Sequence, residues 1–497
     1  MSPTPTISSA IARWMLSHII PSVNLNSVVP EAALAKAKSS VDHSNTSTGA
    51  EYGVGDLVTE KDLAKKRPSR RSAAQTPAPA AAASVTTATA HVDSEAEGRA
   101  RRFGVPLRTK DHSIGKLNVF EVGAGNGTCA VNILDFVRTY YPQVYAQTHY
   151  NIIEMSESLS WQQRELLDAN HAGHYRVHTA NAAEWKQTQS EHAVVFGLEV
   201  LDNMPHDKVV RGKDGQWYQV MVAKAGHVPG PDAGAGVAPV GPDVVDPMLL
   251  NCGTAGKQYG FVEYAVPLSD PVVARCAAMY DEYLAANNNE PVSTNMAAAA
   301  NNSEQKEQQN WLIRKFIDFV FTRRRKRVRR DILYLPTECL RFFMRLDAHF
   351  PSHTLFLADF DVLPSTEAVQ GVHGPVVAHK SESAKARGKT EDADSYLVSL
   401  GLCDIFYPTD FAFLKHMYCK VVLKDAPYRD AVHHFGLGRS ENDMHVTPKE
   451  NVATVITHFD FLWKYAETSK TECRNGFNPL LEDYTNMAIF IGSRQEK

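Results

Sequence analysis

From residue 117 onward, short apolar runs alternate with stretches whose apolar residues fall at helical spacing. The runs predict strands at 117–121, 149–154, 175–179 and 193–199. The stretches between them predict helices at 129–140 and 158–169. Strand and helix alternating in this order imply parallel βαβ units with right-handed crossovers. The pattern therefore predicts an α/β fold with a Rossmann-like sheet.

The alternation stops after residue 205 and resumes far along the chain. The intervening region predicts strands at 216–222 and 259–266 and helices at 311–321 and 337–346. The sheet pattern returns at 354–360, and the last strand is expected at 488–491. We expect this last strand to run antiparallel to its neighbours and the intervening region to be a large insertion.

Three stretches have compositions rich in small, polar or proline residues, at 65–102, 226–247 and 287–309. Such compositions bury too little apolar surface to offset the entropy of ordering the chain. We interpret them as loops or insertions on a folded body. A run at 323–330 has seven basic residues in eight, and it could dock an acidic partner or form a solvated helix face.

Composition narrows the classes of partner. The net charge is −4 and the isoelectric point about 6.6, so no basic field favours nucleic acid. No apolar run reaches the roughly 18 residues of a membrane span. The seven cysteines are dispersed with no Cys-x-x-Cys pair, which argues against disulfides and structural zinc. We expect no metal and a reducing compartment.

The N-terminus has apolar residues that could share one helical face: Ile7, Ile11, Trp14 and Met15. The first acidic residue is Glu31, and serines are frequent. These features match a mitochondrial presequence, but weakly, because Arg13 is the only basic residue before Lys36. A frayed terminus is the alternative interpretation.

The strongest chemical pattern is Glu-Val-Gly-Ala-Gly-Asn-Gly-Thr at 121–128, placed between a strand and a helix. Doubly wound folds bind ligands at such a junction. The three glycines, Gly123, Gly125 and Gly127, allow a sharp turn and a close approach to a ligand. The helix start offers free N–H groups, and Thr128 is expected to cap that helix.

The spacing and one acid distinguish between ligands. The spacing is Gly-x-Gly-x-Gly, whereas nicotinamide and flavin sites commonly have Gly-x-Gly-x-x-Gly. Glu121 lies two residues before the first glycine, where its carboxylate would repel a pyrophosphate. It suits a ligand with an ammonium and a sulfonium. The pattern therefore favours S-adenosyl-L-methionine over a dinucleotide, and a nicotinamide-dependent oxidoreductase is the disfavoured alternative.

Two further residues fit a nucleoside ligand. Glu154 ends the second strand, where an acid can accept hydrogen bonds from both ribose hydroxyls. Asn181 follows the third strand and could meet the adenine amino group. Asparagine is also a common turn former, so that role has a structural alternative.

The fourth strand ends in two acids on the side where a transferable methyl would lie. Glu199 and Asp202 are three residues apart, so a helical turn would place both carboxylates on one face. Paired carboxylates match the planar guanidinium of arginine. We assign Glu199 mainly to orienting the acceptor and secondly to accepting its proton. His206 is a weaker candidate, with a surface histidine as the alternative.

These residues resemble the MidA-like methyltransferases. The glycine motif of that family, Glu-Leu-Gly-x-Gly-x-Gly-Thr, is matched at 121–128 except at Val122. Its motif after the fourth strand is similar in the spacing of Glu199, Asp202 and Pro205. Later resemblances are shorter, at 55–59, 359–361 and 401–411. The departures include Asn126, Val200, Leu201 and Asp361, which replace an arginine, two aromatics and a glycine of the family pattern.

The resemblance implies a class I methyltransferase sheet that uses S-adenosyl-L-methionine. The family includes a mitochondrial arginine methyltransferase that assists assembly of respiratory complex I. The resemblance thus implies a protein substrate, an arginine acceptor and a mitochondrial location. A cytoplasmic location is the alternative. An assembly factor with little or no catalysis is the alternative, and the oligomeric state stays open.

The pattern and the resemblance together predict five regions along the chain. The N-terminal segment is 1–64, followed by a linker or insertion at 65–110. The cofactor-binding half is 111–205, an inserted substrate or partner region is 206–350, and the remainder of the methyltransferase domain is 351–497.

Overall fold

The computed structural model describes residues 7–19, 116–224, 259–287, 331–363, 371–379, 392–430 and 451–494. Several sequence predictions lie outside these ranges. They concern the motif at 55–59, the stretches at 65–102 and 226–247, the helix at 311–321 and the basic run at 323–330. Of the predicted loop at 287–309, only Asn287 is described.

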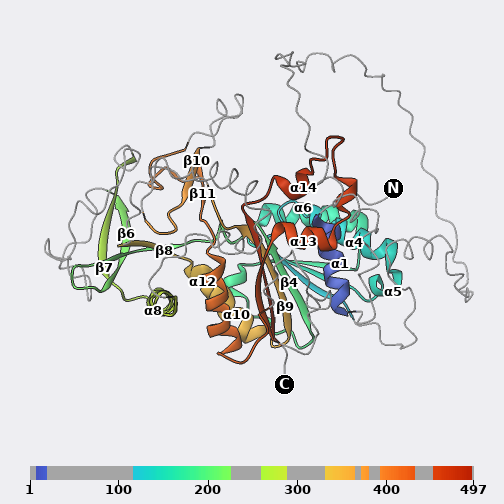
Figure 1. Cartoon of the computed structure of the whole chain (residues 1–497), viewed down its shortest axis with the longest axis horizontal. Coiled ribbons are helices and arrows are strands. Elements are labelled where there is room, and N and C mark those ends of the chain that lie inside the picture. Colours follow the sequence, from blue (N-terminus) through green and yellow to red (C-terminus); the bar gives the residue numbers. More distant parts are fainter. Residues whose placement is uncertain are drawn as a thin grey trace, which may run out of the picture. The chain divides into compact units, whose positions relative to one another are not determined.

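Seven strands form the central sheet in the order β12-β13-β9-β4-β1-β2-β3 (Figure 1). They are β1 (Asn118–Val122), β2 (His149–Glu154), β3 (Tyr175–Thr179), β4 (Ala193–Leu198), β9 (His353–Phe360), β12 (Val452–Thr457) and β13 (Met487–Arg494). Across the sheet, the neighbours β3, β2, β1, β4 and β9 pair in parallel. β13 pairs antiparallel with both β9 and β12. The predicted α/β class and the antiparallel last strand are confirmed.

Parallel pairing brings the chemistry to one edge of the sheet. β1 lies between β2 and β4, and all five of its residues are buried. Glu121 is in register with Ile152 on one side and Phe196 on the other. The carboxyl ends of β1, β2, β4 and β9 therefore meet at the same edge, which is where open α/β sheets bind ligands.

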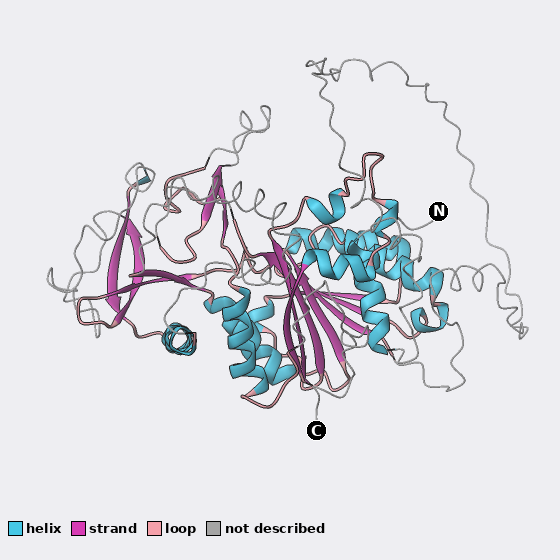
Figure 2. Ribbon diagram, in the orientation of Figure 1, coloured by secondary structure: helices cyan, strands magenta, loops and turns pink. Residues whose placement is uncertain are grey.

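Helices cover both faces of this sheet (Figure 2). The helices on or beside the first face are α1 (Ile7–Ile19), α4 (Thr128–Tyr140), α5 (Pro142–Tyr145), α6 (Glu157–His171), α13 (His458–Tyr465) and α14 (Pro479–Glu482). The opposite face carries α10 (Thr337–His349), α12 (Phe411–Tyr418) and the π-helical turn η6 (Cys419–Leu423). Two short 3-10 turns are η3 (Ala182–Glu184) and η8 (Thr468–Lys470). Apolar residues of the sheet, α8 (Pro271–Ala286), α10, α12 and η6 form one core cluster, and apolar residues of α1, α4 and α13 are also buried.

Helix α1 belongs to the folded body, although it precedes β1, the first strand of the sheet, in the sequence. It packs against α4 and α13, and Trp14 contacts Phe356 of β9 with ring centroids 4.9 Å apart. The buried guanidinium of Arg13 donates to the Tyr465 carbonyl oxygen at 2.8 Å and pairs with Glu467 at 3.4 Å. The apolar spacing noted at the N-terminus is thus used for packing in the core.

A second, antiparallel sheet lies between β4 and α10 in the chain, in the order β7-β6-β5-β8. Its strands are β5 (Asp207–Arg211), β6 (Trp217–Lys224), β7 (Phe261–Pro267) and β8 (Ile332–Leu335). Helix α8 follows β7, and a separate pair consists of β10 (Val376–His379) and β11 (Cys403–Phe406). Lys208 and Glu263 form a buried ion pair across this sheet, with nitrogen–oxygen distances of 2.7 and 2.9 Å.

Across the described ranges, no helix has the length and apolar character needed to cross a bilayer.

Candidate functional site

The loop after β1 is held in conformations that favour glycine. Gly123, Gly125 and Gly127 have φ angles of 67°, 52° and 79°, all in the left-handed region. A Cβ atom on Gly123 would lie 2.4 Å from Cγ2 of Val200. The loop thus passes directly over the segment that follows β4, and a side chain at this position would keep the two apart.

The start of helix α4 leaves backbone donors at the same edge. Its N-cap is Gly127, and no side chain caps it. The expected cap by Thr128 is therefore wrong, because Thr128 is the first helical residue and its side chain is exposed. The first N–H groups of α4 have no acceptor within the helix. They can therefore receive oxygen atoms of a bound ligand.

Glu121 lies beneath the glycine loop and is 2 % exposed. Its Oε2 accepts a hydrogen bond of 2.8 Å from the Tyr150 hydroxyl. Burial raises the pKa of Glu121 to about 7, and the Tyr150 hydrogen bond opposes this rise. A cationic group at the loop would favour the ionised form of Glu121, so the residue is suited to respond to a positively charged ligand.

Glu154 is also buried, and it is linked to the glycine loop. Its Oε1 accepts from the Ser156 backbone N–H at 2.9 Å, and its Oε2 accepts from Nε2 of Gln163 at 3.2 Å. The same Gln163 nitrogen donates to the Gly125 carbonyl oxygen at 2.7 Å. Gln163 therefore ties α6 to both predicted ligand-binding elements. Sequence reasoning missed it, since a glutamine within a helix gives no sign that its side chain is buried.

Asn181 uses both atoms of its amide within the protein. Its Oδ1 accepts from the Ala183 N–H at 2.9 Å and caps η3. Its Nδ2 donates to Oε1 of Glu338 on α10 at 2.8 Å. These contacts correspond to the turn-forming alternative. The adenine contact stays a prediction.

Glu199 and Asp202 lie on one turn but in different environments. The segment after β4 forms turns rather than a helix, and Glu199 has a left-handed φ of 51°. Glu199 is exposed, whereas Asp202 is 2 % exposed and accepts from Nδ2 of Asn203 at 2.6 Å. Burial raises the pKa of Asp202 to about 6, and the charge of Glu199 adds to this rise. Only Glu199 presents its carboxylate to solvent.

Asp359 at the end of β9 holds this turn in place. Its Oδ2 accepts from the N–H groups of Leu201 at 2.7 Å and Asp202 at 3.1 Å, and its Oδ1 accepts from the Phe360 N–H at 2.8 Å. Burial, and secondly the Asp202 charge, raise the pKa of Asp359 to about 7. The sequence placed this acid at a strand end but gave no indication that it binds the turn containing Glu199.

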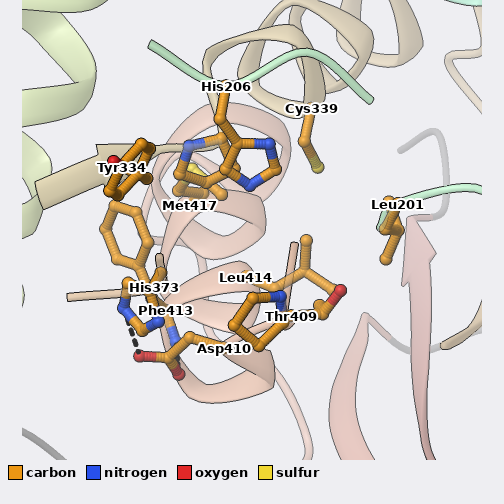
Figure 3. A pocket seen from close by; sticks show the side chains of 12 residues that line it. Leu201, His206, Tyr334, Cys339, His373, Thr409, Asp410, Phe413, Leu414 and Met417 are labelled. Carbon is orange, nitrogen blue, oxygen red and sulfur yellow. Dashed lines mark hydrogen bonds and ion pairs between the residues drawn. The ribbon is translucent and has the colours of Figure 1, made fainter. Parts of the chain in front are cut away.

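A small pocket opens beside this turn (Figure 3). It lies between the segment after β4, the end of β8, the start of α10 and the first turns of α12. His206 lines it, half-buried and stacked on Tyr407 with centroids 4.0 Å apart and planes at 8°. Burial lowers the pKa of His206 to about 3, so this ring is neutral near pH 7. His206 is thus not the surface histidine of the alternative interpretation.

The edge as a whole fits a nucleoside with a charged amino acid end. The glycine loop leaves open space beside Gly125, where a Cβ atom would meet no other atom within 4 Å. Acidic groups lie at the ends of β1, β2 and β9, and no group of three or more His, Cys, Asp or Glu in the described ranges is arranged to hold a metal ion. The acidic groups at these strand ends suit an organic cation such as S-adenosyl-L-methionine.

Comparisons with known proteins agree with this geometry. A family model described as "Putative S-adenosyl-L-methionine-dependent methyltransferase" matches residues 101–426, well over half of the chain. A curated relative from Schizosaccharomyces pombe, named "Protein arginine methyltransferase NDUFAF7 homolog, mitochondrial", is 21 % identical over 277 residues. That match covers 52 % of this chain and 46 % of the relative, so it spans about half of the relative's length.

Two solved structures from Burkholderia thailandensis are similar at 16 % identity. One is an uncharacterised protein with a TM-score of 0.40, and the match covers 76 % of this chain and 74 % of that one. The other was crystallised with S-adenosyl-homocysteine and has a TM-score of 0.38, with coverages of 76 % and 72 %. The family match is the finding that decides membership. The chain belongs to this family of S-adenosyl-L-methionine-dependent methyltransferases, and S-adenosyl-L-methionine is its cofactor.

Proposed function

We propose that the protein transfers a methyl group to an arginine side chain of a protein substrate, and that this substrate is a respiratory complex I subunit in the mitochondrion. The name of the S. pombe relative supports the acceptor type and the compartment. The resemblance of the sequence motifs to a family that includes a complex I assembly methyltransferase supports the choice of substrate. The observation that carries the proposal is the exposed Glu199 carboxylate at the end of β4.

The chemistry needs alignment more than it needs a base. The bound cofactor supplies a methyl group on a sulfonium, which is transferred by in-line displacement. Orienting two reactants can contribute about 7–11 kcal/mol. A general base typically contributes about 10²–10⁴-fold. Holding the acceptor nitrogen in line is therefore the larger task for the protein.

Glu199 is suited to that task. It is exposed on a turn fixed by Asp359, and among the described residues its carboxylate accepts no hydrogen bond from a side chain. A left-handed backbone at a residue other than glycine is strained, and such strain concentrates at functional sites. In this proposal Glu199 orients the guanidinium and takes up the proton that leaves the nitrogen. Asp202 contributes through its charge beside Glu199.

Substitution of Glu199 by glutamine tests this role. Glu199→Gln is expected to lower transfer of tritiated methyl groups into a mitochondrial extract by about 10²-fold, the lower end of general-base effects. Calorimetry should show cofactor affinity within twofold of the wild type. Glu184→Gln is the matched control, an exposed acid on η3 outside the proposed site. Equal turnover by Glu199→Gln would remove Glu199 from the chemistry.

The acceptor is tested in cells that lack the protein. Mass spectrometry of complex I subunits should show the loss of one methylated arginine, restored by the wild-type chain and not by Glu199→Gln. Methylation lost from another residue type would refute the arginine acceptor. Normal complex I assembly with the Glu199→Gln chain would instead favour a methyltransferase-fold assembly factor with little or no catalysis.

A further inference from the structure

The pocket beside the turn after β4 lies at the edge of the sheet that carries the proposed acceptor site. The chain that forms one of its walls runs along the ends of β4 and β9. The Tyr407 N–H donates to the Asp202 carbonyl oxygen at 2.9 Å, and the Thr409 N–H donates to the Phe360 carbonyl oxygen at 2.9 Å. The pocket is therefore fixed to the segment that contains Glu199.

Apolar and aromatic side chains form most of the pocket wall, and its described lining contains no lysine or arginine. Two histidines line it, His206 and His373. Burial lowers the pKa of both rings, so both are neutral near pH 7. Asp410 is the acid in the lining. The described lining thus offers the Asp410 carboxylate no lysine or arginine as a partner.

Asp410 has one oxygen committed and one facing the pocket. Its Oδ1 caps α12 by accepting from the N–H groups of Ala412 and Phe413, each at 3.0 Å. Its Oδ2 lies 3.6 Å from Nε2 of His373, and Figure 3 shows His373 directed at Asp410. This separation is longer than a hydrogen bond. In the described structure Nε2 of His373 has no hydrogen-bond partner, so both atoms can bind a third group.

The backbone of His373 is in a strained conformation. Its φ is 57°, a left-handed conformation that non-glycine residues rarely adopt. The preceding Val372 bridges to β8, where its N–H donates to the Ile332 carbonyl oxygen at 2.8 Å and its own carbonyl oxygen accepts from the Tyr334 N–H at 3.1 Å. These two hydrogen bonds fix the strained residue beside the pocket. Such strain is most often retained where a side chain has a role.

We propose that this pocket binds the guanidinium of the acceptor arginine, with Asp410 as its counter-ion and His373 as a second hydrogen-bond acceptor. The inference rests on the proposed arginine methyltransferase function and extends it to the residues that select the substrate. A guanidinium is planar and weakly hydrated, stacks on aromatic faces and donates in a fixed fork. The neutral ring of His206 offers such a face, and Asp410 and His373 offer the acceptors.

The pocket supplies a second carboxylate for the substrate, which the buried Asp202 cannot provide. The Asp202 carboxyl is buried and already bound by Asn203. Asp202 therefore offers a substrate no accessible carboxylate beside that of Glu199. Glu199 and Asp410 replace the predicted pair of Glu199 and Asp202 in our proposal, one from the turn after β4 and the other from the start of α12.

The test measures binding of small probes to the full-length protein saturated with S-adenosyl-homocysteine. N-acetyl-L-arginine amide is compared with N-acetyl-L-citrulline amide, in which a neutral urea of similar shape replaces the guanidinium. Ligand-observed NMR titrations give both affinities. The wild type should bind the arginine probe at least tenfold more tightly. Asp410→Asn should remove this preference by weakening only the arginine probe, because asparagine still caps α12.

Asp270→Asn is the matched control, since Asp270 caps α8 through the same two kinds of contact. It should leave both affinities unchanged. His373→Asn should weaken the arginine probe several-fold, because asparagine tolerates the left-handed backbone but does not reproduce the imidazole acceptor. Equal affinity of the wild type for both probes would overturn the proposal. So would an arginine affinity unchanged in a folded Asp410→Asn protein.

The pocket and the proposed function can fail separately. Binding of the arginine probe could depend on Asp410 while cells lacking the protein keep all their methylated arginines. In that case the pocket assignment stands and the proposed function fails. If Asp410→Asn methylates arginine in a mitochondrial extract at the wild-type rate and Glu199→Gln does not, the function stands and the pocket assignment is wrong.

Discussion

At the scale of single residues, the site is made of acids whose burial decides their behaviour. Glu121, Asp202 and Asp359 are all nearly inaccessible, and burial raises the pKa of each. Glu199 keeps its exposure because the chain turns through a left-handed conformation there. These four acids thus divide into three that are buried and one, Glu199, whose side chain is exposed.

The raised pKa of Glu121 predicts a pH-dependent stability. The pKa rises from 4.5 in the unfolded chain to about 7 in the folded protein. The contribution of this carboxyl to stability is therefore fully present below pH 4.5 and is lost as the pH rises through about 7. Glu121→Gln cannot ionise but can still accept from Tyr150. We expect its melting temperature without cofactor to exceed that of the wild type at pH 8 and to match it near pH 4.

The gain at pH 8 should be about 3–4 kcal/mol, from about 1.36 kcal/mol for each pH unit between the two pKa values. Thermal unfolding across pH 4 to 8 measures it. Glu157→Gln, an exposed position at the start of α6, serves as the control. A difference between Glu121→Gln and the wild type that stays constant with pH would contradict the assigned cause.

At the scale of elements, the site depends on the contact between two loops. The glycine loop after β1 and the turn after β4 approach each other so closely that Gly123 has no room for a side chain beside Val200. The turn is held from the other side by Asp359 of β9. The cofactor loop and the proposed acceptor turn are thus packed as one unit, although three strands and three α-helices separate them in the sequence.

This contact predicts a coupling between two substitutions. Gly123→Ala should cost about 1–2 kcal/mol for the left-handed backbone and about 1–3 kcal/mol more for overpacking against Val200. Adding Val200→Ala should recover the second cost. Denaturant unfolding of both single variants and the double variant measures the coupling. Gly125→Ala is the control, because its Cβ would meet no atom within 4 Å. Strict additivity for Gly123 and Val200 would disprove the contact.

At the scale of the whole molecule, the fold is assembled from distant parts of the chain. Helix α1 packs on the face that also carries α4 and α13, although about 100 residues separate it from β1. The strands β9, β12 and β13 complete a sheet that began with β1. The antiparallel sheet of β5 to β8 lies between these two halves in the sequence.

The position of Trp14 predicts that α1 is essential to stability. Trp14 is 1 % exposed and packs on Phe356. Trp14→Ala should lower the free energy of unfolding by about 3–5 kcal/mol, as for other buried aromatic residues. Trp161→Ala is the matched control, since Trp161 is 59 % exposed, and it should stay within about 0.5 kcal/mol. Similar unfolding curves for the two variants would show that α1 does not belong to the core.

The sequence by itself determined the elements whose pattern is local. Strands β2 and β3 begin and end where the apolar runs place them, and β1, β4, α4 and α6 differ from the prediction by one or two residues. The glycine loop and the acids at strand ends were readable because a parallel sheet brings the carboxyl ends of its strands to one edge. Strand β12 and helices α8, α12 and α13 were not predicted from the sequence. Their apolar residues show neither a clear helical or strand period nor which element they pack against.

Only the tertiary structure decided which polar groups are buried and what they contact. Gln163 joins Glu154 to the glycine loop, Asp359 binds the turn after β4, and His373 faces Asp410. Each pair joins residues from different elements, so its geometry follows from packing rather than from spacing along the chain. The physical reason is that a local pattern reports which face of an element is apolar, whereas burial of a polar side chain depends on what packs against it.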